Sequence, residues 1–114
     1  MHGICHIEIP AKDFARIGKF YADVFGWGTE NIPEMDYMMF KPPDGVSGGF
    51  DKNLTIADVG GITLYIEVEE VDTILKKVEE NGGKTLKPKT EIPGVGHIAY
   101  FADIEGNRIG LWSK

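Results

Sequence analysis

The sequence predicts an α+β fold made of two β-α-β-β-β modules. Three observations lead to this prediction: the chain repeats itself at about half its length, each half contains one amphipathic helical segment, and short apolar runs divided by turn residues surround each helix. The 114 residues suffice for one domain with a hydrophobic core. We expect a single domain over 1–114, with module one at about 1–57 and module two at about 58–114.

The repeat is visible at three places in the same order. DGVSGGF at 44–50 matches EGNRIGL at 105–111, because both read acid, glycine, three residues, glycine and an apolar residue. NIPEMDY at 31–37 matches EIPGVGH at 91–97, and HIEIPA near the start aligns with TLYIEV at 63–68. The offset between matched residues is about 57 to 61. Three weak matches in one order indicate a duplicated module.

The first helix is expected over residues 13–25. Four apolar residues recur there at helical spacing: Phe14, Ile17, Tyr21 and Val24. Asp13 is a suitable N-cap, because its side chain can accept a hydrogen bond from a free amide of the first turn. Gly26 is a suitable end, since glycine adopts the left-handed conformation that closes many helices.

The second helix is expected over residues 71–81. The apolar residues of one face are Val71, Ile74, Leu75 and Val78. Gly82 and Gly83 follow the last of them and end the helix. Asp72 and Lys76 add a favourable pair four residues apart on the polar face.

The remaining apolar runs predict the strands. The expected strands are 5–10, 28–36, 37–41, 46–50, 63–68, 84–96, 97–102 and 108–112. The turn signals between them are Pro42-Pro43-Asp44-Gly45 and Glu105-Gly106-Asn107. A four-stranded sheet covered by one helix leaves its other face bare. We expect the two bare faces to form a shared cleft, which is where small ligands bind.

Composition excludes several classes of partner. Twelve basic and eighteen acidic residues give a net charge of −6 without a basic cluster, so nucleic acid and anionic membrane surfaces are not expected as partners. No run is apolar enough to span a membrane, and the start of the sequence does not read as a leader. Cys5 is the only cysteine and has no intrachain partner, which fits a reducing, cytoplasmic location.

The whole pattern resembles a known family. The duplicated modules, the segment CHIEIPAKDFARIGKFYADVFGW, the helix end VEENGGK and the segment IPGVGHIAYFADIEGNRIGLW resemble the vicinal oxygen chelate superfamily. This superfamily contains glyoxalase I, bleomycin resistance proteins and extradiol dioxygenases, and the likeness is greatest to its small glyoxalase-related proteins. The resemblance covers nearly the whole chain. It predicts the fold more sharply than the function, because one scaffold supports several chemistries.

The resemblance also assigns metal-ligand positions. In metal-using members, the first and last strands of both modules each supply one ligand. In this sequence His6 occupies the first of these positions, and Thr63, Gly49 and Gly110 occupy the others. Glycine has no donor side chain and threonine is a poor neutral one. We therefore expect no family metal site and no cofactor, and lactoylglutathione lyase activity is not carried over.

Alternation along the strands selects the candidate site residues. His6 and Glu8 share one face and are the candidate catalytic residues. The candidate ligand-binding residues are Tyr65, Glu67, Arg108 and Trp112. Arg108 could bind an anion and Trp112 could stack on a planar group. The glycines at 48, 49 and 110 are expected to leave room for a ligand or a facing backbone. Structural alternatives are a simple His6–Glu8 hydrogen bond and pairing of Arg108 with Glu8 or Glu67.

The leading expectation is a glyoxalase-related protein that binds a small organic molecule without the family metal. The enzymatic version is a lyase or isomerase that uses His6 and Glu8 as acid and base. The alternatives are a metal-dependent lyase or dioxygenase with unidentified ligands, and a protein that sequesters a drug, as bleomycin resistance proteins do. A homodimer is expected from the resemblance and from aromatic residues such as Trp27, which look exposed in the sequence.

Overall fold

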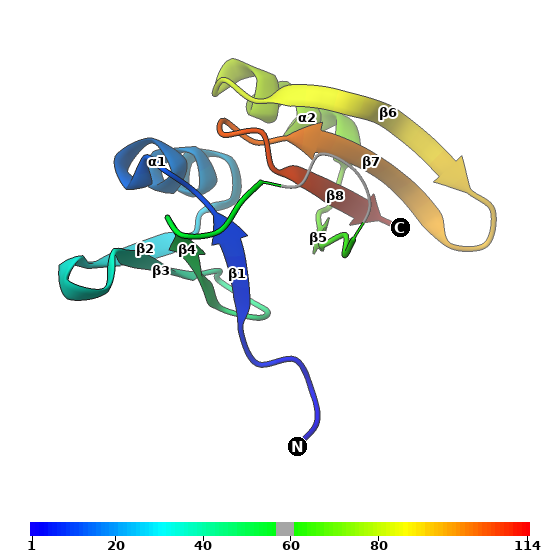
Figure 1. The fold of residues 1–114 in the computed structure, drawn as a ribbon. Coiled ribbons are helices and arrows are strands. Elements are labelled where there is room, and N and C mark those ends of the chain that lie inside the picture. Colours follow the sequence, from blue (N-terminus) through cyan, green and yellow to red (C-terminus); the bar gives the residue numbers. More distant parts are fainter. Residues whose placement is uncertain (57–60) are drawn as a thin grey trace. The chain divides into compact units, whose positions relative to one another are not determined.

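A computed structural model describes residues 1–56 and 61–114 (Figure 1). The chain divides into two compact units, residues 1–56 and 57–114. Each unit contains one α-helix and a four-stranded mixed sheet in the order β-α-β-β-β, which confirms the predicted α+β class. One curved sheet around a shared cleft, and a single domain over 1–114, stay predictions.

The first unit has one helix and four strands. They are β1 (Ile7–Pro10), α1 (Phe14–Phe25), β2 (Gly28–Ile32), β3 (Tyr37–Lys41) and β4 (Gly48–Asp51), with a 3-10 helix at Pro33–Met35 between β2 and β3. The strand order is β1-β4-β3-β2. β1 runs parallel to β4, whereas β2, β3 and β4 are antiparallel neighbours. The predicted segment 28–36 therefore divides in two, because Pro33 has no amide hydrogen to continue the strand.

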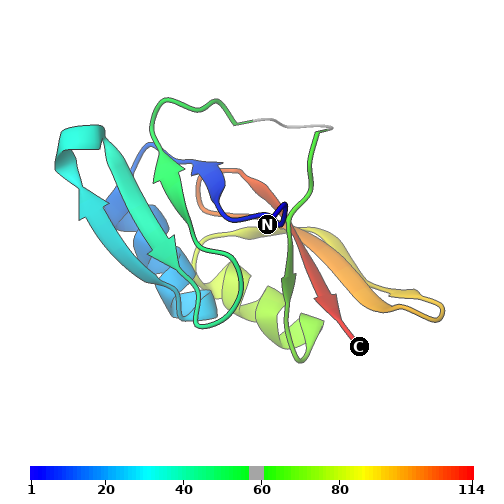
Figure 2. The same cartoon turned by 90° about the horizontal axis from the view of Figure 1, so that it is seen from below.

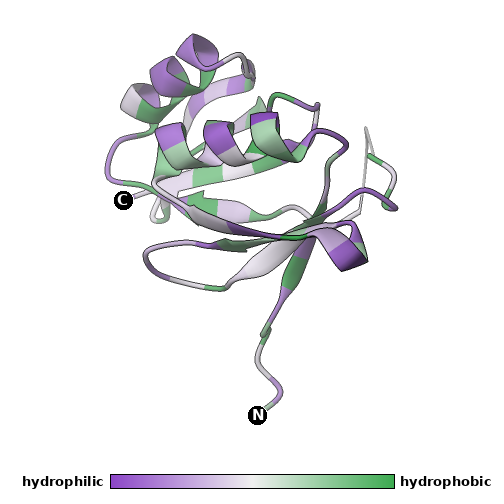
Figure 3. Cartoon of the chain, turned by 90° about the vertical axis from the view of Figure 1, so that its left-hand side faces the viewer, coloured by the Kyte–Doolittle hydropathy of each residue, from purple (hydrophilic) through white to green (hydrophobic). Residues whose placement is uncertain are grey.

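The ends of α1 follow the sequence signals. The Asp13 side chain accepts a hydrogen bond from the Arg16 amide at 3.1 Å, which satisfies a free donor of the first turn. Gly26 adopts the left-handed conformation with φ of 75°, and its amide donates to the Ala22 carbonyl. Hydrophilic and hydrophobic residues alternate around both helices (Figure 3). The predicted boundaries of α1 are confirmed to within one residue.

The apolar face of α1 forms an aromatic core with its own sheet. Trp27 stacks between Tyr21 and Phe40, with 4.6 Å between ring centroids on each side. Tyr21 also contacts Phe50 on β4. Burial of these rings is the main stabilising term of this unit. Trp27 is therefore a core residue, and the expectation that it is exposed for a dimer interface is wrong. The homodimer itself stays a prediction.

The second unit repeats the arrangement (Figure 2). Its elements are β5 (Tyr65–Glu67), α2 (Val71–Glu80), β6 (Lys84–Ile92), β7 (Gly96–Ala102) and β8 (Arg108–Ser113). The strand order is β5-β8-β7-β6, and β5 is parallel to β8. The predicted strand 84–96 ends at Ile92, because Pro93 and Gly94 form a turn in which Gly94 has φ of 77°.

Glu70 fixes the start of α2. Its carboxylate accepts hydrogen bonds from the Asp72 and Thr73 amides, and it also forms an ion pair with Lys89 on β6 at 2.8 Å. Val71, Leu75 and Val78 are the buried residues of the helix, as the helical spacing predicts. Glu70 thus caps the helix and ties it to the edge strand of its sheet.

Membrane insertion is not indicated by the helices. Among residues 1–56 and 61–114, neither helix is long or apolar enough to cross a bilayer.

Candidate functional site

The first unit has a helix-covered sheet face and an opposite face. In the strand register, Ile9 and Met38 flank Phe50 on the side that packs against α1. Glu8 pairs with Gly49 one residue earlier, so both lie on the opposite face. Tyr37 lies one position before Met38 and shares that opposite face. His6 comes two residues before Glu8 and reaches the same side.

His6, Tyr37 and Glu8 form a continuous hydrogen-bonded chain, which we call the His6 cluster. The Tyr37 hydroxyl lies 2.6 Å from His6 Nε2 and donates to Glu8 Oε2 at 3.0 Å. The hydroxyl hydrogen is used on Glu8, so the Tyr37 oxygen accepts from His6 and Nε2 carries a hydrogen. That tautomer leaves the Nδ1 lone pair of neutral His6 unused by the cluster. The direct His6–Glu8 bond considered from the sequence is replaced by a chain through Tyr37.

Tyr37 stays protonated over an unusually wide pH range. Burial and the hydrogen bond to the Glu8 carboxylate raise its pKa from 10.0 to about 12. The ring is 7% exposed, whereas His6 and Glu8 are both exposed. At neutral pH the phenol therefore acts as a fixed bridge between an accessible imidazole and an accessible carboxylate.

Gly49 makes room for the Tyr37 ring. A Cβ added to Gly49 would overlap Tyr37 Cζ, Cε2 and the hydroxyl oxygen. At the neighbouring Gly48, an added Cβ would overlap the Ile7 carbonyl, since β1 approaches closely there. The expectation that Gly49 leaves room for a ligand is therefore wrong, because a tyrosine of the same unit fills the space.

The second unit carries a different polar group on the corresponding face. Gly110 on β8 lies between Tyr65 on β5 and Tyr100 on β7. The two tyrosine hydroxyls are 2.5 Å apart. The Arg108 guanidinium lies over the Tyr100 ring, with Cζ 3.9 Å from the centroid, and Nη1 donates to Thr63 Oγ1 at 2.9 Å. We call Thr63, Tyr65, Tyr100 and Arg108 the Arg108 cluster.

The two phenols of the Arg108 cluster titrate as a pair. Acceptance of the hydrogen bond from Tyr65 and the positive charge of Arg108 lower the pKa of Tyr100, while the same hydrogen bond raises the pKa of Tyr65. Tyr100 is therefore the phenol that loses its proton first, because its anion would lie beside the guanidinium.

The positions that the resemblance assigns to metal ligands do not fit a metal. An added Cβ at Gly110 would lie 2.6 Å from Tyr65 Cδ1, so Tyr65 fills that position as Tyr37 fills the one at Gly49. The Thr63 hydroxyl accepts from Arg108, and a cation beside a guanidinium would be repelled. In the described parts of the chain, no three His, Cys, Asp or Glu side chains gather into a possible metal site.

The predicted ligand-binding residues of the second unit lie on one face of the sheet, but at different positions along the strands. Glu67 pairs with Trp112, and Tyr65 pairs with Gly110 one step away. Arg108 and Trp112 are four residues apart on β8, which corresponds to roughly 13 Å. Among the described residues of the second unit Arg108 forms no ion pair, so the expected alternative of pairing with Glu67 is wrong. Pairing with Glu8, which belongs to the first unit, stays a prediction.

Two site tyrosines were missed from the sequence. Tyr37 and Tyr100 bridge the groups that the sequence selects, yet neither stands on a first or last strand. Alternation does hold a signal for both: Tyr37 precedes core residue Met38, and Tyr100 lies between core residues Ala99 and Phe101. That pattern places each ring on the face opposite the helix.

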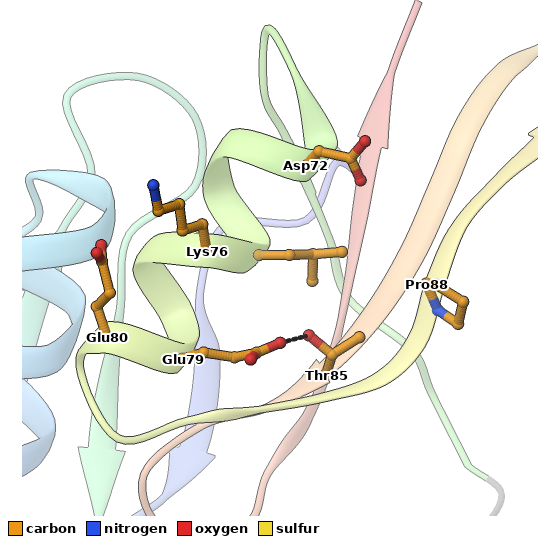
Figure 4. Close-up of a pocket in the computed structure, with 7 residues that line it drawn as sticks. Asp72, Lys76, Glu79, Glu80, Thr85 and Pro88 are labelled. Carbon is orange, nitrogen blue, oxygen red and sulfur yellow. Dashed lines mark hydrogen bonds between the residues drawn. The ribbon is translucent and has the colours of Figure 1, made fainter.

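The second unit also has a shallow pocket of about 570 Å³ between α2 and β6 (Figure 4). The residues that line it are Asp72, Leu75, Lys76, Glu79, Glu80, Thr85 and Pro88. Thr85 donates a hydrogen bond to Glu79 across the groove at 2.5 Å, and Lys76 and Glu80 point away from β6 (Figure 4). None of the predicted site residues lines this pocket.

Comparison with known proteins identifies the family. A sequence model of the Glyoxalase/Bleomycin resistance protein/Dioxygenase superfamily matches residues 3–111. The chain belongs to this superfamily. A glyoxylase-like domain-containing protein from Didymella fabae is 34% identical over 100% of this chain and 96% of its own length. A putative glyoxylase from Mycobacterium bovis is 25% identical over 93% of this chain, which spans 43% of that longer protein.

Solved structures of the glyoxalase superfamily have the same fold. The fosfomycin resistance protein FosX from Listeria monocytogenes has a TM-score of 0.81 at 16% identity, over 100% of this chain and 94% of that one. A glyoxalase-related enzyme from Fulvimarina pelagi has a TM-score of 0.79 at 18% identity, over 100% and 89%. At these identities the likeness shows the fold alone, and the chemistry has to be argued from this chain's own residues.

Proposed function

We propose that this glyoxalase-superfamily protein binds a small organic molecule without the family metal. The observation that carries the proposal is the filling of both last-strand ligand positions by tyrosine rings, Tyr37 at Gly49 and Tyr65 at Gly110. Those rings replace the side chains that would hold an ion with hydroxyls that donate and accept hydrogen bonds. Hydroxyls, an imidazole and charged groups gathered beside aromatic rings are able to orient a small organic ligand.

The enzymatic form of this proposal is a lyase or isomerase that uses the His6 cluster. Neutral His6 can take a proton at Nδ1, because Nε2 already donates to Tyr37. The positive charge that forms on the ring would be stabilised by the Glu8 carboxylate through the Tyr37 hydroxyl. His6 is then the acid or base, Glu8 supplies the charge, and Tyr37 holds the imidazole in one tautomer.

The binding step can be tested with ligand-observed NMR. Protein treated with a chelator is screened against small aromatic and aliphatic acids, amides and alcohols, and the hits are measured again after addition of Ni²⁺, Zn²⁺, Mn²⁺ or Fe²⁺. We expect the hits to bind with the same affinity in both conditions. A stoichiometric metal in protein purified without chelator, or binding that needs the metal, would contradict the proposal and favour a metal-dependent lyase or dioxygenase.

The acid–base step needs a separate test. For any hit that the protein converts, His6→Ala should leave binding intact and abolish turnover. Tyr37→Phe should lower turnover less severely, because it removes the bridge and leaves the imidazole. If His6→Ala turns over the compound normally, the His6 cluster has no catalytic role.

Drug sequestration is the second candidate, because two comparisons are to proteins whose names involve antibiotics. FosX is a fosfomycin resistance protein, and a 52-residue match covering 46% of this chain at 33% identity is to an anthracycline biosynthesis protein from Streptomyces peucetius. Fosfomycin, bleomycin and an anthracycline therefore belong in the same screen. Tight binding of one of them, with the compound recovered unchanged, would favour sequestration over catalysis.

A further inference from the structure

Tyr100 is flanked by two cations. Arg108 lies over its ring, and Lys87 is its cross-strand partner on β6. In the described residues of the second unit, neither Arg108 nor Lys87 forms an ion pair with a carboxylate. Together they place positive charge beside exposed hydroxyls in a protein whose net charge is −6. The local charge therefore favours an anion that the rest of the chain would repel.

The guanidinium of Arg108 is fixed in place without a carboxylate partner in the described residues of the second unit. Nη1 donates to Thr63, and the planar group stacks on Tyr100, so its position is set before any ligand arrives. The Arg108 side chain also hydrogen-bonds the Tyr100 hydroxyl. Among the described residues of the second unit no carboxylate pairs with this guanidinium, whose planar N–H donors match the two oxygens of a carboxylate.

The two tyrosine hydroxyls supply a further donor at the same place. Tyr65 and Tyr100 share one hydrogen bond in which either can be the donor, so one of their two hydroxyl hydrogens is available to a third group. The cation beside the Tyr100 ring makes this phenol more acidic, and a more acidic phenol is a stronger donor. Tyr65 is 48% exposed, so the hydroxyl pair is accessible from solvent.

We propose that Arg108, Tyr100 and Tyr65 form a binding site for the carboxylate of a small organic acid. N–H donors of the Arg108 guanidinium take the two oxygens, a hydroxyl of the Tyr65–Tyr100 pair donates to one of them, and Lys87 adds charge. The inference rests on the proposed binding function and narrows its ligand to an anion. Both tyrosine rings flank the site, which favours an acid whose carboxylate is attached to an apolar or aromatic group.

The probes are benzoate, its neutral isostere benzamide, and phenylphosphonate, measured by NMR titration or calorimetry. We expect benzoate to bind about tenfold or more tightly than benzamide, because one or more charge-assisted hydrogen bonds are lost in the amide. Arg108→Gln should weaken benzoate binding by about the same factor and leave benzamide binding unchanged. Tyr100→Phe should weaken it less, since it removes one neutral donor.

The chain offers a matched control. Arg16→Gln removes the same charge from an exposed helix position whose backbone amide, rather than its side chain, makes the cap bond, and it should leave benzoate binding unchanged. Arg108→Lys keeps the positive charge but lacks the planar, forked donors of the guanidinium. It tests whether those donors are needed, and it serves in place of Arg108→Gln if that variant does not fold. It should bind benzoate more weakly than the parent protein.

Four results would overturn the inference: equal affinity for benzoate and benzamide, equal effects of Arg16→Gln and Arg108→Gln, full benzoate affinity in Arg108→Lys, or no benzoate binding at all. Tighter binding of phenylphosphonate would overturn the carboxylate assignment and point to a phosphonate or phosphate. The wider proposal fails separately, if no organic compound binds the metal-free protein. Benzoate and benzamide that bind equally well, and both independently of Arg108, would keep the wider proposal while rejecting the carboxylate site.

Discussion

The Tyr37 ring lies directly over the α-carbon of Gly49, in the space that any side chain at that position would need. The Tyr37 hydroxyl also hydrogen-bonds both His6 and Glu8. The side chain is therefore held by two hydrogen bonds at its tip and by packing of its ring on the sheet. A packed ring that is fixed in this way cannot swing aside without losing all of these contacts. Gly49 and Tyr37 therefore act as one structural unit.

Gly49→Ala should destabilise the protein by about 1–3 kcal/mol, because the new methyl group forces the buried Tyr37 ring to move. Gly110→Ala is the matched comparison, and it should cost less than about 1 kcal/mol, since the half-exposed Tyr65 ring can move into solvent and alanine restrains the unfolded strand. Urea unfolding of both variants measures the difference. In a Tyr37→Ala background the cost of Gly49→Ala should disappear, and equal costs in both backgrounds would contradict the packing argument.

Tyr37 also makes stability depend on alkaline pH. Its pKa of about 12 in the fold exceeds the value of 10.0 in the unfolded chain, so only the unfolded state loses this proton between these values. Stability is fully present below pH 10 and should fall by up to about 3 kcal/mol as pH rises to 12. Tyr37→Phe should lack this component, and the difference between the two unfolding profiles isolates it. Parallel profiles would show that Tyr37 does not titrate this way.

The Tyr65–Tyr100 pair should be the first source of tyrosinate on raising pH. The Arg108 charge favours the anion of Tyr100, so one proton should leave the pair below the ordinary phenol pKa and the second one above it. Ultraviolet difference titration detects each step. Tyr100→Phe should remove the early step, whereas Arg108→Gln should shift it to higher pH. An early step that survives Tyr100→Phe would have to come from another tyrosine.

Glu70 should couple the stability of α2 to acid pH. Its hydrogen bonds with Lys89 and with the Asp72 amide lower the pKa of the carboxylate, so its contribution is present at neutral pH. That contribution should be lost as pH falls through the lowered pKa. Glu70→Gln should reduce the melting temperature at neutral pH and make it less sensitive to acid and to salt. Glu80→Gln, at the other end of the same helix, should not lower it, because removing a negative charge near a helix C-terminus is favourable.

Much of the fold was predictable because its signals are local. The spacing of Ile17, Tyr21 and Val24 and the cap at Asp13 define α1 without any knowledge of its neighbours. The internal repeat gave the module order, and alternation correctly put Tyr65 and Gly110 on one face. These features depend on residues that are close in sequence, so one chain is enough to read them.

The site was predictable only in part, because its contacts depend on cross-strand register. His6 and Glu8 were found by alternation, but the hydroxyl that joins them belongs to Tyr37, 31 residues from His6. A glycine in a strand indicates that something comes close, without indicating what. At Gly49 and Gly110 the neighbour is a ring from another strand of the same unit rather than a ligand.

The two halves fill the same gap in different ways. The strand registers make Gly49 equivalent to Gly110, and by the same registers Tyr37 is equivalent to Ile98 and Tyr65 to Glu8. The ring comes from β3 in the first half and from β5 in the second. The two halves share the glycine, but the tyrosine that packs against it comes from strands that are not equivalent. Each half can therefore change the residue that fills this position and keep the scaffold intact.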